Sequence, residues 1–382
     1  MRFQKIIAVL FVSALCNYPC FSQSDSISSE QHVNGVEKPW MLGPFVRPAS
    51  EKPIISSDTN SLFLDPMSGK EVRWQSKATF NPAAIVRNNQ IQVLYRAEQD
   101  LLTEKIGSHT SRIGLATSND GIVYNTEVEP IFYPDNDAQK KYEWPGGTED
   151  PRIVETEDGM YVLTYTQWNR DIPRLAVATS YDLKKWTKHG PIFEKYKDGK
   201  YNNKETKSGA IVTQLKDGKL VAAKIKGKYY MYFGVSHIWL ATSEDLLNWE
   251  PLENYQGTLT PVLNPRPGYF DSWLVEAGPP PVLTENGIVV LYNAGNSANI
   301  GVKNLGNRVY SSGQALYSAD EPWKLLDRSD KPYIKPELPF EKSGQYKDGT
   351  TFVEGLVYFR EKWFLYYGTA DSMVGVAVAG AE

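Results

Sequence analysis

The sequence contains little cysteine and little histidine. Among its 382 residues there are two Cys and four His. Both Cys, at positions 16 and 20, fall in a segment that we expect to be removed, so the mature chain would have no thiol nucleophile and no disulfide. The four histidines are His32, His109, His189 and His237, and they are too scattered to supply a metal-ligand pair. We therefore expect no catalytic metal, and we also expect no organic cofactor.

Basic runs are also missing. No stretch of five or more consecutive Lys or Arg residues occurs, and the formal net charge is −4. Nucleic-acid binding usually depends on clustered basic side chains, so this pattern argues against a nucleic-acid partner. The chain is instead 41% hydrophobic and 12% aromatic, which is typical of a globular protein with a large core.

The apolar run near the N-terminus is short. It covers residues 6–15, whereas a helix needs about 20 apolar residues to cross a bilayer, so we expect no membrane span. Arg2 and Lys5 precede the run, and Cys20 and Ser22 place small residues at the −3 and −1 positions of a cleavage site. These features predict a secretory signal peptide at residues 1–22 and export to the periplasm.

A lipid anchor is the less favoured alternative for this segment. Cys16 and Cys20 are available, but Leu15 and Pro19 are poor residues immediately before a lipidated Cys. Residues 23–38 are polar and rich in Ser, which predicts a flexible leader. Residues 39–382 are then expected to form one folded domain.

One sequence motif returns along the chain at intervals of about 60–75 residues. Clear copies are residues 114–120 (GLATSND), 176–182 (AVATSYD) and 239–245 (WLATSED), followed by weaker copies at 315–320 and 374–378. An aromatic and β-branched stretch precedes each copy, at residues 91–96, 160–166, 229–233, 288–292 and 363–367. Five units of antiparallel strands predict an all-β fold, a five-bladed β-propeller with a central funnel. A β-sandwich would not explain the fivefold return of the motif.

In a propeller the first strand of each blade lines the axis, so five chain-distant segments should meet in the funnel. These segments are residues 80–82, 149–152, 207–209, 276–278 and 348–350, with Glu354. They bring carboxylates, including Asp348, together with Lys and Arg. Carboxylates surrounded by Trp and Tyr are typical of a carbohydrate site, although structural ion pairs around the axis would leave the same pattern.

At these segments the chain resembles glycoside hydrolase family 130, a family of five-bladed propellers that includes β-mannoside phosphorylases and β-1,2-mannosidases. No single motif is specific, but the set occurs in family order from about residue 40 to the C-terminus. It comprises residues 80–83 (FNPA), 95–97 (YRA), 147–152 (GTEDPR), 164–166 (TYT), 224–229 (KIKGKY), 238–246 with Trp249, 277–281 (AGPPP) and 366–371 (YYGTAD).

The resemblance implies a role for Asp150 as the catalytic acid, which protonates the leaving oxygen through a hydroxyl of the −1 sugar. It also implies sugar-binding residues and a residue that shapes the cavity, Asp371. The sugar-binding set is Asn81, Arg96, Arg152 and Lys207. For Arg96 and Arg152, a salt bridge that orients Asp150 is the alternative.

The family divides between phosphorylases, which need a cationic phosphate pocket, and hydrolases, which need a carboxylate base to activate water. Where phosphorylases have a His-Arg pair, this chain has Phe233 and Gly234, although Arg170 and Arg174 remain candidates for another part of an anion site.

Two carboxylates favour hydrolysis. Glu276 replaces a Gly common in phosphorylases, and Glu205 stands two residues before Lys207, so we expect Glu276, and less firmly Glu205, to be the base. For Glu205 a solvated loop charge is the alternative. An inverting hydrolase separates acid and base by about 6.5–9.5 Å, and we expect Asp150 and Glu276 to face each other across the cavity at this wider spacing.

The sequence therefore predicts a secreted, inverting, exo-acting β-mannosidase that cleaves β-1,2-mannosides. A β-mannoside phosphorylase is the first alternative and a non-catalytic glycan-binding propeller is the second; a glycosidase acting on arabinan or fructan fits the motifs less well. The expected partner is a mannoside or mannan-derived oligosaccharide. Segments 99–112 and 296–310 are candidates for substrate contacts or a subunit interface, and the oligomeric state is left open.

Overall fold

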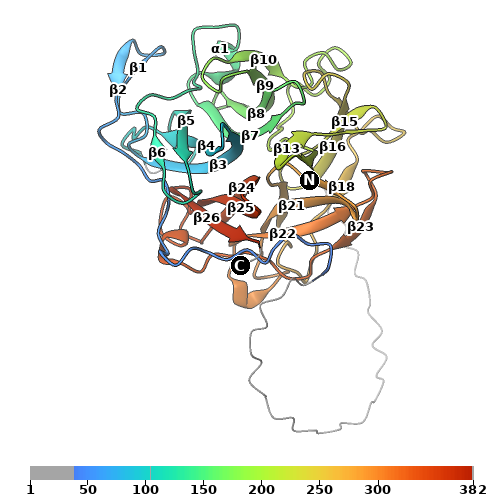
Figure 1. The fold of residues 1–382 in the computed structure, drawn as a ribbon. Coiled ribbons are helices and arrows are strands. Elements are labelled where there is room, and N and C mark those ends of the chain that lie inside the picture. The colour runs from blue at the N-terminus through green and yellow to red at the C-terminus, as the bar shows by residue number, and fades with distance from the viewer. Residues whose placement is uncertain (1–37, 104, 381–382) are drawn as a thin grey trace, which may run out of the picture. The chain divides into compact units, whose positions relative to one another are not determined.

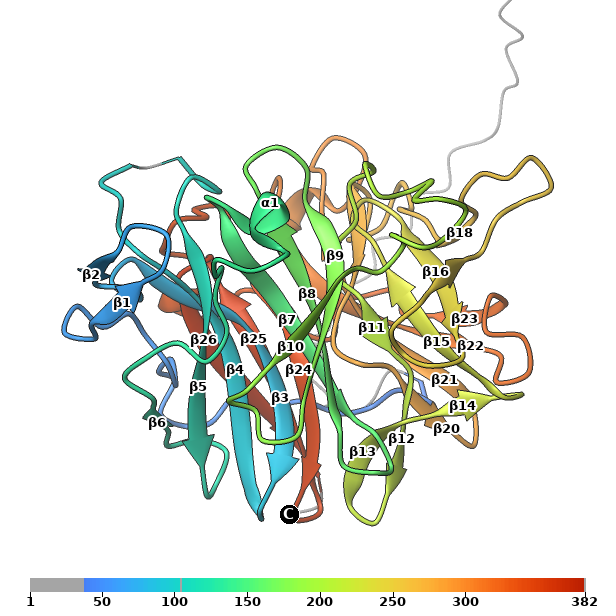
Figure 2. The ribbon, with the colours of Figure 1, turned by 90° about the horizontal axis from the view of Figure 1, so that it is seen from above.

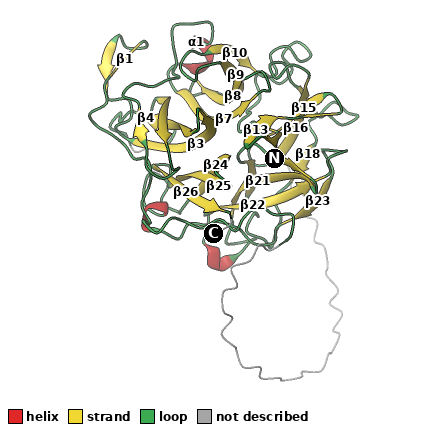
Figure 3. Cartoon of the chain, in the orientation of Figure 1, coloured by secondary structure: helices red, strands yellow, loops and turns green. Residues whose placement is uncertain are grey.

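The computed structural model describes residues 38–380 except residue 104. The predicted signal peptide, residues 1–22, and nearly all of the predicted leader lie outside the described residues. Strands and loops make up almost all of the described chain (Figure 3), which confirms the all-β prediction. The helical elements are α1 (Lys140–Glu143) and two single 3-10 turns, Lys303–Leu305 and Pro339–Glu341. None of the described helices is long and apolar enough to cross a membrane.

The strands form consecutive antiparallel groups, and each stretch predicted as an aromatic strand lies in one of them. A small hairpin, β1 (Phe63–Asp65) and β2 (Lys70–Val72), precedes the groups. The first group is β3 (Ala78–Arg87), β4 (Gln90–Glu98), β5 (Ser111–Ser118) and β6 (Asn125–Thr126). The second is β7 (Gly147–Glu155), β8 (Tyr161–Trp168), β9 (Arg174–Ser180) and β10 (Thr187–Pro191).

The remaining groups follow the same order with more interruptions. The third contains β11 (Ala210–Ile211), β12 (Thr213–Lys216), β13 (Lys219–Ala222), β14 (Lys224–Ile225), β15 (Lys228–Phe233), β16 (Ile238–Ser243), β17 (Glu250–Pro251) and β18 (Pro261–Leu263). The fourth contains β19 (Leu274–Ala277), β20 (Val282–Thr284), β21 (Gly287–Gly295), β22 (Tyr310–Tyr317) and β23 (Leu325–Arg328). The fifth is β24 (Thr351–Phe359), β25 (Lys362–Thr369) and β26 (Met373–Ala379).

Short parallel pairings connect the inner strands of neighbouring groups. Strand β7 pairs with β5 and with β13, and β12 pairs with β20. The groups follow one another around a common centre, with β3, β7, β13, β21 and β24 nearest to it (Figure 1), and the long hairpins lie side by side in the second view (Figure 2). The paired strands form sheets of 15, 6, 3 and 2 strands, and no sheet among the described residues closes on itself.

The repeated sequence motif builds a repeated turn. After β5 the Ser118 hydroxyl and the Asp120 carboxylate accept hydrogen bonds from the backbone N–H groups of residues 120–123. The same pattern recurs after β9 at Ser180 and Asp182, and after β16 at Ser243 and Asp245. Short polar side chains satisfy N–H groups that a tight turn leaves without strand partners. The motif therefore recurs along the chain because it forms these turns, and not because it takes part in catalysis.

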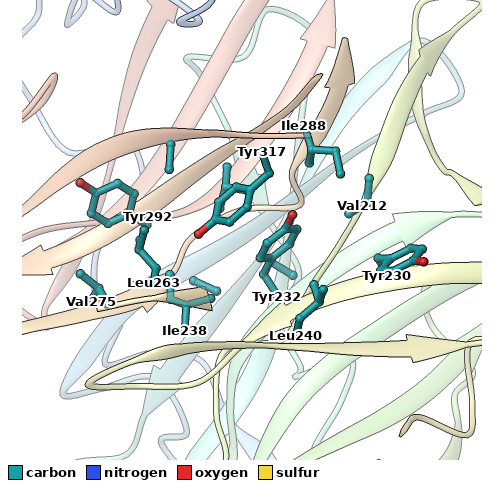
Figure 4. Close-up of a cluster of buried hydrophobic side chains, with 14 of the residues drawn as sticks. Val212, Tyr230, Tyr232, Ile238, Leu240, Leu263, Val275, Ile288, Tyr292 and Tyr317 are labelled. Carbon is teal, nitrogen blue, oxygen red and sulfur yellow. The ribbon is translucent and has the colours of Figure 1, made fainter. Parts of the chain in front are cut away.

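Aromatic side chains fill the space between neighbouring groups. Figure 4 shows one such cluster, in which the Tyr232 and Tyr317 rings lie 5.0 Å apart between the third and fourth groups. Both hydroxyls reach backbone carbonyls, Tyr232 that of Pro322 at 2.6 Å and Tyr317 that of Val262 at 3.0 Å. Buried Tyr residues need such partners, because an unpaired hydroxyl in a core is costly. The aromatic content of the sequence is thus mainly a packing feature.

Three inner strands carry a β-bulge close to the centre. The register shifts between Phe80 and Pro82 in β3, between Glu149 and Arg152 in β7, and between Val353 and Gly355 in β24. A bulge adds an unpaired residue and redirects side chains at that point of the strand. The bulges contain Asn81, Asp150 and Glu354, so the fold directs three polar side chains out of the regular ladder at corresponding places.

The segment that follows the leader joins the last group. Val46 pairs with Val378 and Ile55 with Val374, both antiparallel, and Val378 and Val374 belong to β26. Backbone hydrogen bonds of 2.8–3.0 Å support these pairings. The outer edge of the fifth group is therefore covered by a chain segment that precedes the first group.

Replacing Trp249 by Ala should lower the free energy of unfolding by about 3–5 kcal/mol, since a buried indole would leave a cavity. Trp249 is 1% exposed, and its indole N–H donates to the Leu246 carbonyl at 3.0 Å. Trp323, 46% exposed, offers a matched control. Denaturant unfolding would contradict the packing assignment if Trp323→Ala and Trp249→Ala lost equal stability.

Candidate active site

A cavity of about 470 Å³ lies where residues from all five strand groups meet. Its chemistry is dominated by carboxyl groups, because among the described residues seven acidic side chains and two basic ones line it. The acidic residues are Glu98, Glu149, Asp150, Asp171, Glu205, Glu276 and Asp371, and the basic residues are Arg96 and Lys207. Aromatic rings complete the wall at Phe80, Trp168, Tyr310, Tyr346 and Phe352.

Arg96 is the centre of the acidic cluster. Its guanidinium donates to Asp150 at 2.9 Å, to Glu149 at 2.9 Å and to Glu98 at 2.7 Å, and its Nε donates to the Ser111 hydroxyl at 3.1 Å. Strand β4 supplies Arg96, and β3 supplies the Phe80 ring under the guanidinium, at 4.7 Å. All three carboxylates are nearly buried. One delocalised cation thus holds three acidic side chains together.

Asp150 is held at the bulge of β7 with a positive φ of 49°, which is rare outside Gly, Asn and Asp. Asn81, at the bulge of β3, has a φ of 48° and donates from Nδ2 to Asp150 Oδ1 at 2.8 Å. Lys207 Nζ lies 3.3 Å from the other carboxylate oxygen. The structure therefore brings Asn81, Arg96 and Lys207 around Asp150, as the sequence predicted for their positions.

These neighbours set the charge of Asp150. Burial by itself would raise its pKa, but Lys207, Arg96 and the hydrogen bond from Asn81 outweigh burial and hold the pKa well below the ordinary value. The free site therefore contains an ionised Asp150 at neutral pH. An acid role for Asp150 would therefore require it to take up a proton first.

Glu276 lies on β19 and lines the same cavity as Asp150, with 5% of the residue exposed. The Ser208 hydroxyl donates to its carboxylate. Burial raises the pKa of Glu276, and the opposing effects of Lys207 and Ser208 do not fully offset this. Glu205 also lines the cavity but is exposed, so the structure places both predicted bases beside the acid in different environments.

Two predicted binding residues do not line the cavity. Arg152 is 1% exposed and donates to backbone carbonyls of residues 150, 277 and 278, and its ion pair is with Glu354 rather than with Asp150 as the alternative expected. Asp348 is exposed and approaches Arg308 at 3.9 Å. Strand β24 begins only at Thr351, so Asp348 still belongs to the preceding turn, and Thr350 contributes to the cavity in its place.

Asp371 follows β25 in a left-handed turn, with a φ of 51°, and lines the cavity. Burial raises its pKa to about 7, and Glu98 and Asp150 add to the rise while Arg96 opposes it. Gln345 donates to the Asp371 carbonyl and to the Glu98 carboxylate, both at 2.9 Å. The cavity thus contains one carboxyl group with a lowered pKa and another that still holds a proton near neutral pH.

Several residues of the cavity wall were not predicted from the sequence. Glu98 stands two residues after Arg96 on β4, so the alternation of a strand could have placed both on one face. The aromatic residues Tyr310 and Tyr346 carried no such signal. Segment 99–112 was a candidate for substrate contacts or for a subunit interface. Two of its residues, Ile106 and Gly107, line the cavity, and the Trp168 indole donates to the Gly107 carbonyl at 2.9 Å. This segment is therefore a cavity wall. No group of three metal-ligating side chains occurs among the described residues.

Comparison with known proteins agrees with this geometry. The model of glycoside hydrolase family 130, described as beta-1,4-mannooligosaccharide phosphorylase, matches residues 57–382. The chain belongs to glycoside hydrolase family 130. A 1,2-beta-oligomannan phosphorylase from Thermoanaerobacter sp. is 32% identical over 82% of this chain and 93% of its own length. A Beta-1,2-mannobiose phosphorylase from the same organism is 30% identical, over 85% and 96%.

Solved structures of family 130 are more similar still. One has 52% identity and a TM-score of 0.89 over 92% of this chain and 99% of its own length. It is described by the statement that this family of mannoside phosphorylases contains glycoside hydrolases that target beta-1,2 mannosidic linkages in Candida mannan. A putative glycosidase from Bacteroides thetaiotaomicron, also 52% identical, has a TM-score of 0.87 over 88% of this chain and 96% of its own length.

Replacing Lys207 by Met should raise the pKa of Asp150, because the ammonium that favours its ionised form would be gone. Carbon-13 NMR of Asp carboxyl groups, with the Asp150 signal assigned by its loss in Asp150→Asn, would measure the shift. Lys216→Met removes an ammonium from the exposed Lys216–Glu157 pair and should leave that signal unchanged. An unchanged Asp150 pKa in Lys207→Met would contradict the assigned electrostatics.

Proposed function

We propose that this chain is an inverting, exo-acting β-mannosidase that hydrolyses β-1,2-mannosides. Its five strand groups would be the blades of a five-bladed propeller whose axis holds the cavity. We further propose that residues 1–22 direct export to the periplasm. Fractionation of cells that express the full chain and a form lacking residues 2–22 would test export, since only the full chain should reach the periplasm.

The balance of charges in the cavity is the observation that carries hydrolysis. Phosphate needs cationic donors that are free to bind it. Both basic residues of the cavity wall, Arg96 and Lys207, already contact carboxylates, Arg96 at 2.7–2.9 Å and Lys207 at 3.3–3.8 Å. The acidic side chains of this cavity would repel a phosphate dianion, whereas they would not repel water, which carries no charge. Water is therefore the favoured nucleophile.

The positions expected to bind phosphate also favour hydrolysis. Phe233 is buried against Phe193, with ring centroids 5.3 Å apart. A Cβ at Gly234 would lie 2.2 Å from a ring carbon of Trp239, so a side chain there would require the indole to move. Arg174 donates to the carbonyls of Asn202 and Ile172 and to the Asn203 side chain. Neither Arg170 nor Arg174 is among the described residues of the cavity wall.

The proposed chemistry uses two carboxylates on different strand groups. Glu276 accepts a proton from water as the water oxygen attacks the anomeric carbon, and the bond to the leaving oxygen breaks. Asp150 first takes up a proton from solvent, because it is ionised in the free site, and gives it to a sugar hydroxyl, which passes its own proton to the leaving oxygen; Glu276 later releases the proton it took from water to solvent, so that the proton balance closes. The raised pKa of Glu276 makes it a stronger base than an ordinary Glu, provided that the pH lies above that pKa.

Incubation with β-1,2-mannobiose in phosphate-free buffer should yield free mannose. Added inorganic phosphate should neither be required nor produce mannose 1-phosphate, as chromatography of the products would show. Strict dependence on phosphate would overturn the hydrolase proposal.

A β-mannoside phosphorylase is the second candidate, because two curated relatives that are 30–32% identical are named as phosphorylases. The same incubation distinguishes the two activities. Mannose 1-phosphate would be the product of phosphorolysis.

Asp150→Asn and Glu276→Gln should each lower kcat about 10²–10⁴-fold, which is the usual contribution of a general acid or base. Isothermal titration with β-1,2-mannobiose should still detect binding. Glu205→Gln provides the comparison for the second candidate base, and a larger loss there than in Glu276→Gln would transfer the role of base to Glu205. Unchanged turnover in Asp150→Asn would contradict Asp150 as the catalytic acid, both for a hydrolase and for a phosphorylase.

The acidic limb of the pH–kcat/KM profile should lie above pH 4.5, the ordinary pKa of a Glu side chain. Glu276 must be ionised to accept a proton, and burial raises the pH at which this occurs. Activity should therefore fall as the pH decreases through the raised pKa. A profile that stays flat down to pH 4 would contradict Glu276 as the base.

A further inference from the structure

Arg152 links the strand of the proposed acid to the strand of the proposed base. Its Nη1 donates to the Asp150 carbonyl at 3.2 Å, on its own strand β7. Its Nη2 donates to the Ala277 carbonyl at 2.8 Å, and its Nε donates to the Gly278 carbonyl at 2.9 Å. Ala277 directly follows Glu276 on β19, so one guanidinium contacts the backbone beside both proposed catalytic carboxylates.

Glu354 is the counter-ion of this guanidinium. One of its carboxylate oxygens lies 2.8 Å from Arg152 Nη1, and the side chains are 1% and 0% exposed. Glu354 comes from the bulge of β24, in the fifth strand group. Asn293 fixes the preceding residue, since it accepts from the Val353 N–H at 2.7 Å and donates to the Val353 carbonyl at 3.0 Å. The pair therefore joins three strand groups that are distant in sequence.

The shape of Arg suits this place. A planar guanidinium has five N–H donors, which can bond several acceptors in fixed directions, whereas an ammonium has three donors and no fork. Here the acceptors are the three backbone carbonyls of Asp150, Ala277 and Gly278, and the Glu354 carboxyl group forms an ion pair with the same guanidinium. A buried cation without a counter-ion would be strongly destabilising, and this explains why a carboxylate from a third strand is required.

We propose that the Arg152–Glu354 pair is a positioning unit that fixes the separation and orientation of Asp150 and Glu276. This inference rests on the proposed function of the two carboxylates. Arg152 and Glu354 do not touch the substrate; they act through the backbone beside the residues that do. The resemblance to the family implied sugar binding for Arg152, and the geometry assigns it this other task.

The pair also acts on the titration of the site. The charged groups that face Glu354 are Arg152 and Asp150 from β7, Glu276 from β19 and Arg96 from β4. Burial raises the pKa of Glu354 well above its ordinary value, although the charge of Arg152 opposes this, and the charge of Arg152 also makes ionisation of Glu276 easier. A variant that keeps the positive charge at position 152 should therefore keep the titration of Glu276.

Glu354→Gln tests this unit together with Arg152→Lys, which keeps the charge but lacks the planar fork. With β-1,2-mannobiose, both variants should show kcat values reduced by about 10²-fold, the cost expected for misplacing reacting groups by about 1 Å, with KM changed much less. In Arg152→Lys, which keeps the charge, both limbs of the pH–rate profile should stay in place.

A matched control is the buried pair of Arg112 and Asp65, 2.7 Å apart and outside the cavity wall. Asp65→Asn should lower the melting temperature without changing kcat or the pH profile. If Glu354→Gln does not fold, the test rests on Arg152→Lys, whose kcat should be well below that of Asp65→Asn.

The positioning role is overturned if the folded Arg152 and Glu354 variants keep the wild-type kcat. It is also overturned if Asp65→Asn loses as much kcat as they do. A wild-type chain that cleaves no mannoside, with or without phosphate, would instead refute the proposed function itself.

Discussion

The convergence of Glu98, Glu149 and Asp150 on the guanidinium of Arg96 is the interaction on which the site depends. Three nearly buried carboxyl groups could not lie so close together without a cation between them. Arg96 and, on one side, Lys207 supply that charge, and in doing so they lose their freedom to bind an anion. The same contacts that make the acidic cluster possible are therefore the ones on which the proposal of water as the nucleophile rests.

The backbone positions these groups more than side-chain choice does. Asn81 and Asp150 occupy bulges with positive φ, and Asp371 lies in a left-handed turn, so each side chain leaves the regular alternation of its strand. Gly368 allows the approach of Asn81, since a Cβ there would lie 2.3 Å from the Asn81 side-chain oxygen. Local departures from ideal strands are thus concentrated where polar groups must face a shared space.

Periodicity in the sequence predicted the strands, because alternation and turn chemistry are local properties. It also predicted that Asp150, Lys207 and Glu276 would share a cavity, since equivalent positions of repeated units meet at one centre. It could not predict that Asp348 lies outside the cavity, because the placement of Asp348 depends on the residue at which β24 begins. The direction in which Arg152 points was equally hidden, because its carbonyl partners lie on another strand group and backbone acceptors leave no trace in residue identity.

The pairing of Val46 with Val378 and of Ile55 with Val374 bears on the order of folding. Contacts between segments so far apart in sequence have a large entropic cost of chain closure, and they cannot form until β26 has been synthesised. A nascent chain would hold the earlier strand groups with the fifth group incomplete and its edge uncovered. Completion of the last sheet therefore requires the two ends of the folded domain to meet, which would make it a late step that commits the molecule to its native state.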